Sequence, residues 1–172
     1  MGQGQEDVGA FRLGPPIDEL TRSRVEVPNL PSTVVERGRL VELIDRGARG
    51  PLTLVSAPAG TGKTVAVATW VASGHVPGPI VWITLGEDAD AAQLWTLLAE
   101  ALHRNGVFDR GTLPQPSAGS ADDFLSALTA GLAARREPVV LVLDCPIDLP
   151  PDSATDLHEL LTATYGRLRL IT

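Results

Sequence analysis

Four short, mainly apolar runs occur along the chain, at residues 52–56, 80–85, 139–143 and 168–171, and their polar members are Thr53, Ser56, Thr84 and Arg169. Unbroken apolar runs of this length suit strands that are covered on both faces, as in a parallel sheet. We therefore predict four buried strands, the first of which reaches from Leu52 to Ser56.

The stretches between these runs carry apolar residues at helical spacing. The clearest helix is predicted over residues 91–104, whose apolar face holds Leu94, Leu97, Leu98, Ala101 and Leu102. Further helices are predicted over residues 63–73 and 152–164, and another is expected to begin at a Ser120 cap. Ser32-Thr33 is expected to cap a helix that carries Val35, Leu40, Leu43 and Ile44. Strands that alternate with helices in this way predict a doubly wound α/β fold.

Proline and glycine mark the connections. Residues 1–20 are rich in glycine, glutamine and acidic residues and contain Pro15-Pro16, which predicts a flexible leader before one domain over residues 21–172. Residues 25–31 are expected to be extended, because a proline disfavours the helical conformation in the residue before it. Residues 105–119 hold three glycines and two prolines and are expected to form a surface loop.

The first predicted strand leads into a glycine-rich loop, residues 57–64, with the sequence Ala57-Pro58-Ala59-Gly60-Thr61-Gly62-Lys63-Thr64. A strand, such a loop and a helix together bind nucleotide polyphosphates. The loop amides from Ala59 onward and the positive end of the helix would face the phosphate oxygens. Lys63 would reach the terminal phosphates, and the Thr64 hydroxyl would ligate Mg²⁺. Ala57 stands where the usual pattern has glycine, and a small residue suffices there.

A second motif supports this interpretation. The third apolar run ends in Asp144, some 80 residues beyond the Gly-Lys-Thr sequence. In a parallel sheet this carboxylate lies at the carboxyl edge, beside the glycine-rich loop. Asp144 can therefore hold Mg²⁺ directly or through water.

The residue after Asp144 bears on hydrolysis. Many P-loop ATPases with an additional strand have a second acid there to orient the attacking water, and this chain has Cys145. A thiol is a poor general base for that task. Glu87 or Asp88 could supply a substitute carboxylate, although acids that start a helix are the plainer explanation. Nucleotide binding is thus better supported than hydrolysis, and slow ATPase activity stays open.

Composition limits the other classes of function. The chain has 172 residues, 44% hydrophobic content and a net charge of −7, which indicates one globular domain and argues against a nucleic-acid surface. Cys145 is the only cysteine, so neither an internal disulfide nor a cysteine-based zinc site can form. The sequence has no secretory signal and no apolar stretch of about 18 residues, so we expect a cytoplasmic protein without membrane contact.

Three segments resemble the nucleotide-binding module of MalT-like regulators, the large ATP-binding transcription regulators of the LuxR type within the STAND ATPases. They are Val35-Glu36-Arg37-Gly38-Arg39-Leu40, residues 52–64 and Val81-Trp82-Ile83-Thr84-Leu85. The resemblance covers roughly residues 20–172 and implies a three-layer P-loop NTPase with a mainly parallel sheet. It implies that ATP or ADP with Mg²⁺ acts as a switch for self-association and transcription regulation. It also implies that the segment around Val35 and Arg37 contacts the adenine and ribose.

The chain departs from this family in three ways. Cys145 replaces a second acid, and Val65 replaces a threonine whose hydroxyl would lie near the α-phosphate. The family also continues beyond the equivalent of Thr172 into a last strand, a lid, helical repeats and a DNA-binding domain. The resemblance therefore implies a nucleotide-binding domain that is truncated at its C-terminus.

Two other functions stay open. A free-standing P-loop enzyme such as a small-molecule kinase would need a lid with arginines that closes on the phosphoryl group. The 105–119 loop has only Arg104 and Arg110 nearby and makes a poor lid. A degenerate scaffold would have lost nucleotide binding and would serve only a protein partner.

Overall fold

The structure is a computed structural model, and it describes residues 19–33, 35, 37–116, 121–145, 149 and 151–172. Its four strands are β1 (Leu52–Thr53), β2 (Ile80–Thr84), β3 (Val139–Asp144) and β4 (Leu168–Ile171). They form one sheet in the order β1-β4-β3-β2, and each neighbouring pair is parallel. The predicted α/β class with a parallel sheet is confirmed.

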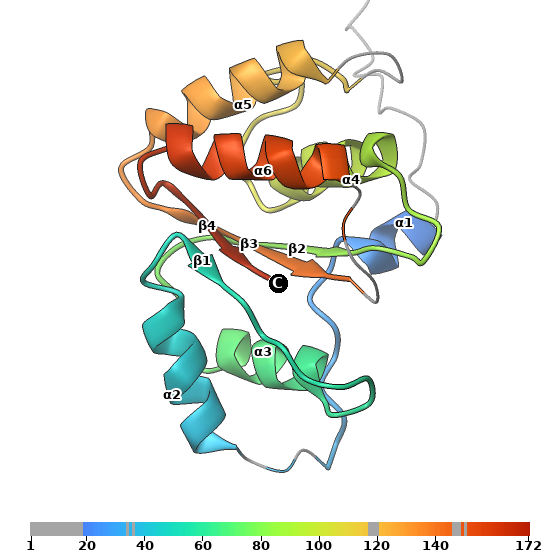
Figure 1. The fold of residues 1–172 in the computed structure, drawn as a ribbon, viewed down its shortest axis with the longest axis vertical. Helices are drawn as coiled ribbons and strands as arrows, with labels where there is room; N and C mark the ends of the chain where they lie inside the picture. Colours follow the sequence, from blue (N-terminus) through green and yellow to red (C-terminus); the bar gives the residue numbers. More distant parts are fainter. Residues whose placement is uncertain (1–18, 34, 36, 117–120, 146–148, 150) are drawn as a thin grey trace, which may run out of the picture.

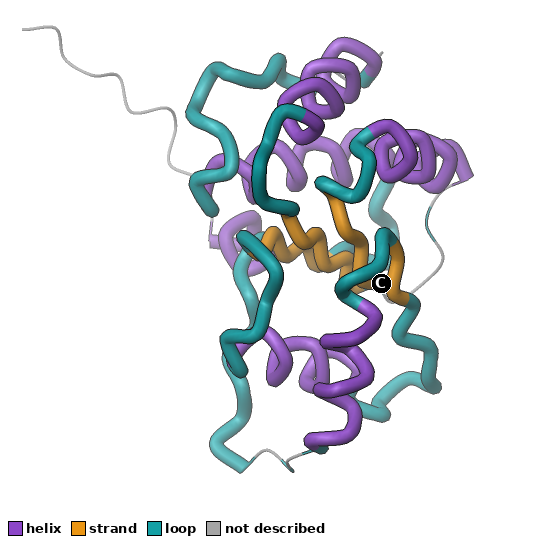
Figure 2. Tube along the Cα trace, turned by 90° about the vertical axis from the view of Figure 1, so that its left-hand side faces the viewer, coloured by secondary structure: helices purple, strands orange, loops and turns teal. Residues whose placement is uncertain are grey.

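Helices cover both faces of this sheet, so that the molecule has three layers (Figure 1). On one face lie α4 (Ala91–Arg104), α5 (Asp122–Ala133) and α6 (Pro151–Ala163), and on the other lie α2 (Gly38–Gly47) and α3 (Lys63–Ala72). The short α1 (Glu19–Arg24) lies beside β2. Figure 2, turned by 90°, shows the strands between the two groups of helices.

The strand sequences explain why the sheet is covered twice. Successive side chains of a strand point to opposite faces. In β3, Val139, Leu141 and Leu143 pack with α4, α5 and α6, whereas Val140 and Val142 pack with α2 and α3. Because both sets are apolar, β3 has no polar face to turn to water, and its five apolar residues are all buried. This accounts for the unbroken apolar run of the third predicted strand.

Most predicted elements agree with the structure to within about a residue. This holds for the helices predicted over residues 63–73, 91–104 and 152–164 and for the last three strands. Residues 25–31 form irregular chain, and residues 105–116 form turns and loop. The Ser120 cap, positions 117–119 of the predicted surface loop and positions 1–18 of the predicted leader lie outside the described residues.

Two predicted boundaries are wrong. The helix expected to start after Ser32-Thr33 begins only at Gly38, where the Arg37 carbonyl accepts the amides of Leu40 and Val41. Val35 is β-branched and 76% exposed, so a longer helix would order an unfavourable residue without burying it.

The first strand is also shorter than predicted, since β1 ends at Thr53 rather than Ser56. One more backbone bond joins it to the end of β4, from Val55 N to Thr172 O at 2.6 Å. Beyond this bond the chain leaves the sheet edge and turns into the glycine-rich loop. The carboxyl ends of β1 and β3, and the start of α3, consequently lie at one edge of the sheet.

Candidate functional site

The glycine-rich loop makes a tight turn that two glycines permit. Gly60 and Gly62 have φ values of 75° and 84°, in the left-handed region that side chains other than glycine avoid. Between them, the Thr61 hydroxyl donates to the Pro58 carbonyl at 2.8 Å. The Lys63 ammonium donates to the carbonyl of Ala57 at 2.7 Å and to that of Pro58 at 3.3 Å. Lys63 therefore joins the end of the loop to its beginning.

Helix α3 starts directly from this loop. Its N-cap is Gly62, and no described side chain caps it. The first-turn amides of a helix have no partner within the helix, and the macrodipole places partial positive charge there. The loop and α3 thus offer backbone donors to an anion at the point where Lys63 adds a full charge.

Thr64 and Asp144 meet although they are 80 residues apart. The Thr64 hydroxyl donates to the Asp144 carboxylate, with oxygen–oxygen distances of 2.9 and 3.1 Å, and both residues are partly buried. Thr64 lies in the first turn of α3 and Asp144 ends β3. A hydroxyl and a carboxylate are hard oxygen ligands of the kind that Mg²⁺ prefers. The described residues include no cluster of three or more His, Cys, Asp or Glu suited to a metal, so Mg²⁺ here would need further oxygens from water or phosphate.

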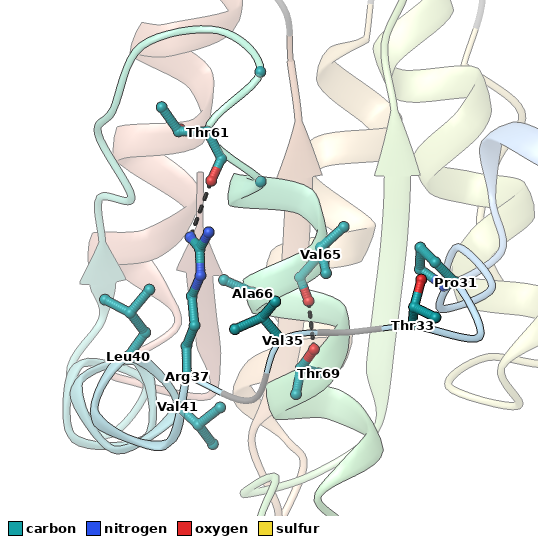
Figure 3. A pocket seen from close by; sticks show the side chains of 12 residues that line it. Pro31, Thr33, Val35, Arg37, Leu40, Val41, Thr61, Val65, Ala66 and Thr69 are labelled. Carbon is teal, nitrogen blue, oxygen red and sulfur yellow. Dashed lines mark hydrogen bonds between the residues drawn. The ribbon is translucent and has the colours of Figure 1, made fainter.

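Two pockets flank the loop within the described part of the chain. One has a volume of about 220 Å³, and Figure 3 shows it between α2, the loop and the start of α3. Six predicted site residues line it: Val35, Arg37, Gly60, Thr61, Gly62 and Val65. The other pocket, of about 520 Å³, is lined by three more: Lys63, Thr64 and Asp144. Pro58 and Ala59 are exposed and line neither pocket.

Arg37 makes a contact that the sequence did not predict. Its guanidinium Nη1 donates to the Thr61 carbonyl at 3.0 Å (Figure 3). The side chain that starts α2 is therefore joined to the glycine-rich loop 24 residues further along the chain. Glu87 and Asp88, the candidates for a substitute carboxylate, are exposed and line neither pocket.

Cys145 lies in the larger pocket beside Asp144. Burial disfavours the charged thiolate, and the neighbouring Asp144 carboxylate adds repulsion. Together they raise the pKa of the Cys145 thiol to about 11. The thiol therefore stays protonated at neutral pH and offers no anionic base at this position.

We expect Cys145 to resist alkylation in the folded protein. With a pKa of about 11, the thiolate makes up only about one part in a thousand at pH 8. The iodoacetamide rate should therefore rise roughly tenfold per pH unit up to about pH 11. Mass spectrometry of the single cysteine measures it, and the same chain unfolded in urea is the control. Equal rates for the folded and unfolded chains at pH 8 would contradict the raised pKa.

Comparison with known proteins supports the fold. No family model and no curated protein matches the chain. Among solved structures, it is similar to Cdc6p from Pyrobaculum aerophilum, with a TM-score of 0.58 and 21% sequence identity. The match covers 90% of this chain and 42% of that one, so the chain spans less than half the length of Cdc6p. This chain has a P-loop NTPase-like fold.

At this level of identity the likeness bears on fold alone. The MalT-like resemblance therefore stays a prediction. None of the described helices is both long enough and apolar enough to cross a bilayer.

Proposed function

We propose that this chain binds ATP or ADP with Mg²⁺ at the glycine-rich loop and acts as a nucleotide-dependent switch. The observation that carries the proposal is the pair formed by Thr64 and Asp144, whose oxygens lie 2.9 Å apart. A hydroxyl from the helix start and a carboxylate from the strand end, next to a lysine-bearing loop, are the parts that hold a phosphate-bound magnesium ion.

Each part of the site has a distinct role in this proposal. The amides of Ala59 to Thr64 surround the phosphate oxygens, and the Lys63 ammonium neutralises the terminal phosphates. Thr64 and Asp144 hold Mg²⁺, which supplies positive charge to the phosphates. The smaller pocket receives the sugar and base, because Val35, Leu40, Val41, Val65 and Ala66 give it an apolar wall.

The switch rather than the enzyme is favoured by the surroundings of Asp144. Cys145 is a neutral thiol with a pKa of about 11. Asp144 is the only carboxylate among the described residues that line the larger pocket, and it is assigned to the metal. Water activation therefore has no evident base, and we propose slow hydrolysis at most.

The wider biological role that we propose rests on the resemblance and not on the geometry of the site. By its resemblance to MalT-like regulators, the chain would be the cytoplasmic nucleotide-binding module of a transcription regulator. ATP and ADP would then control self-association or contact with a protein partner. Neither nucleic acid nor membrane would touch this part.

Calorimetric titration with Mg-ADP and Mg-ATP tests the proposal directly. Binding with one site per chain is the expected result, and no heat with either nucleotide would favour the degenerate scaffold. Turnover assays then separate the switch from an enzyme. Fast release of phosphate, or its transfer to a small acceptor, would favour the free-standing kinase.

Asp144→Asn is expected to make nucleotide binding nearly independent of Mg²⁺. The amide keeps the shape of the side chain but lacks the negative charge that attracts the ion. Titration of ADP with Mg²⁺ and with EDTA, in the wild type and the variant, measures the effect. Asp88→Asn removes one exposed carboxylate that lines neither pocket and should behave as the wild type. An unchanged Mg²⁺ dependence in Asp144→Asn would mean that the metal lies elsewhere.

A further inference from the structure

Arg37 supplies a second cation to the glycine-rich loop, and it lines the smaller pocket whereas Lys63 lines the larger one. We propose that Arg37 binds the phosphate group nearest the sugar of a bound nucleotide. This inference rests on the proposed function and changes the role that the MalT-like resemblance implies for Arg37, which is contact with the adenine and ribose.

The position of Arg37 is fixed by its backbone. As the N-cap of α2, its carbonyl accepts the amides of Leu40 at 2.8 Å and Val41 at 3.2 Å. From there the side chain extends to the loop, where Nη1 donates to the Thr61 carbonyl. Nη1 also lies 4.0 Å from the point that a Cβ on Gly62 would occupy. The guanidinium thus lies against the turn from which α3 begins.

The charge of this guanidinium is uncompensated within the described chain. Three of the other described arginines form ion pairs, namely Arg49 with Asp45, Arg104 with Glu26 and Arg110 with Glu100. Arg37 has none among the described residues, and its hydrogen bond is to a neutral carbonyl. A guanidinium carries five N–H donors, and the described residues accept from only one of those of Arg37. An exposed, unpaired guanidinium at a helix start is suited to an anion.

The positions of the two pockets indicate which phosphate of the nucleotide Arg37 would bind. Lys63 lines the larger pocket with Thr64 and Asp144, where the terminal phosphates and Mg²⁺ belong in the proposed function. Arg37 lines the smaller pocket, whose apolar wall suits the base. If a nucleotide extends across the loop from one pocket to the other, the phosphate bonded to its sugar lies beside Arg37. The guanidinium points at the loop rather than into the apolar wall, which favours phosphate over base (Figure 3).

The test compares Arg37→Gln and Arg37→Lys with Arg39→Gln, all in the full chain. Arg39 is exposed, lies in the first turn of α2 and lines neither pocket, so its variant loses one charge away from the ligand. The probes are Mg-ADP and Mg-2′-deoxy-ADP, titrated at low and high salt. Arg37→Gln should lower the affinity for both nucleotides about ten- to a hundredfold, because one charge-assisted hydrogen bond is lost. Its affinity should also depend less on salt, because one screened ion pair is gone.

The lysine variant should recover part of the affinity and the salt dependence, while Arg39→Gln should match the wild type. Wild-type affinity in Arg37→Gln would overturn the inference. A loss seen with ADP but not with 2′-deoxy-ADP would also overturn it, since Arg37 would then bind the ribose hydroxyl. A third contrary result would be a loss of affinity in Arg37→Gln with unchanged salt dependence. Arg37 would then stabilise the loop without binding the phosphate.

Failure of the proposed function looks different in the same experiment. If the wild type binds neither nucleotide, or if Lys63→Ala binds both as well as the wild type, then the glycine-rich loop is not the site. Both proposals would then fall. If Lys63→Ala loses binding and Arg37→Gln does not, only the role of Arg37 is wrong.

Discussion

Replacing Lys63 with alanine is expected to reduce the affinity for Mg-ADP and Mg-ATP by at least about a hundredfold, which corresponds to roughly 3 kcal/mol. The ammonium supplies the charge at the terminal phosphates, and it also closes the loop through the carbonyls of Ala57 and Pro58. Alanine removes both interactions, so the loop loses its shape and its charge together. Calorimetry on the two proteins measures the difference.

The sequence offers an independent check, because Lys63 is its only lysine. An amine-directed acylating reagent can therefore modify only Lys63 and the N-terminal amine. Saturating Mg-ADP should protect Lys63 and leave the N-terminal amine as reactive as before, which peptide mass spectrometry resolves. Equal modification of Lys63 with and without nucleotide, or unchanged affinity in Lys63→Ala, would contradict its contact with the phosphates.

Buried elements were more predictable than exposed ones in this chain. β2 and β3 are buried on both faces, so their apolar runs identify them without further context. In contrast, α1 is six residues long and none of its described residues is buried, so it leaves no apolar periodicity in the sequence. The start of α2 was misplaced because hydroxyl residues at 32 and 33 imitate a cap, whereas Arg37 occupies that position without a side-chain cap among the described residues.

The contacts of the candidate site also differ in how far the sequence predicts them. The meeting of Thr64 and Asp144 follows from topology, because a parallel sheet brings the end of β3 to the edge where α3 begins. The contact of Arg37 with Thr61 does not follow from topology. A long side chain has many rotamers, and only the placement of α2 beside the loop selects the one that reaches the carbonyl. The likeness to Cdc6p supports the fold but assigns no role to either pair.

Among these variants, Gly78→Ala is expected to give the largest loss of stability. The free energy of unfolding should fall by roughly 3 kcal/mol, which lowers the melting temperature by about 10 °C in a chain of this size. A Cβ on Gly78 would lie 1.9 Å from the carbonyl oxygen of Pro138, closer than any nonbonded contact allows. The neighbouring backbone cannot yield easily. The amide of Val140 donates to the Pro79 carbonyl at 2.9 Å, and that of Val139 donates to the Arg167 carbonyl at 2.7 Å. The methyl group would thus force β2 and β3 apart at the ends where they begin.

Thermal and urea denaturation of Gly78→Ala and Gly38→Ala measure this effect against a matched control. Gly38 begins α2 and a Cβ there would have no atom within 4 Å, so its alanine variant should be as stable as the wild type or slightly more stable. Equal melting temperatures for the wild type and Gly78→Ala would mean that the two strands separate at little cost. Gly78 lies at the amino ends of the strands, whereas the glycine-rich loop lies at their carboxyl ends. At a temperature where Gly78→Ala is folded, it should therefore bind Mg-ADP with the affinity of the wild type, which separates loss of stability from loss of the site.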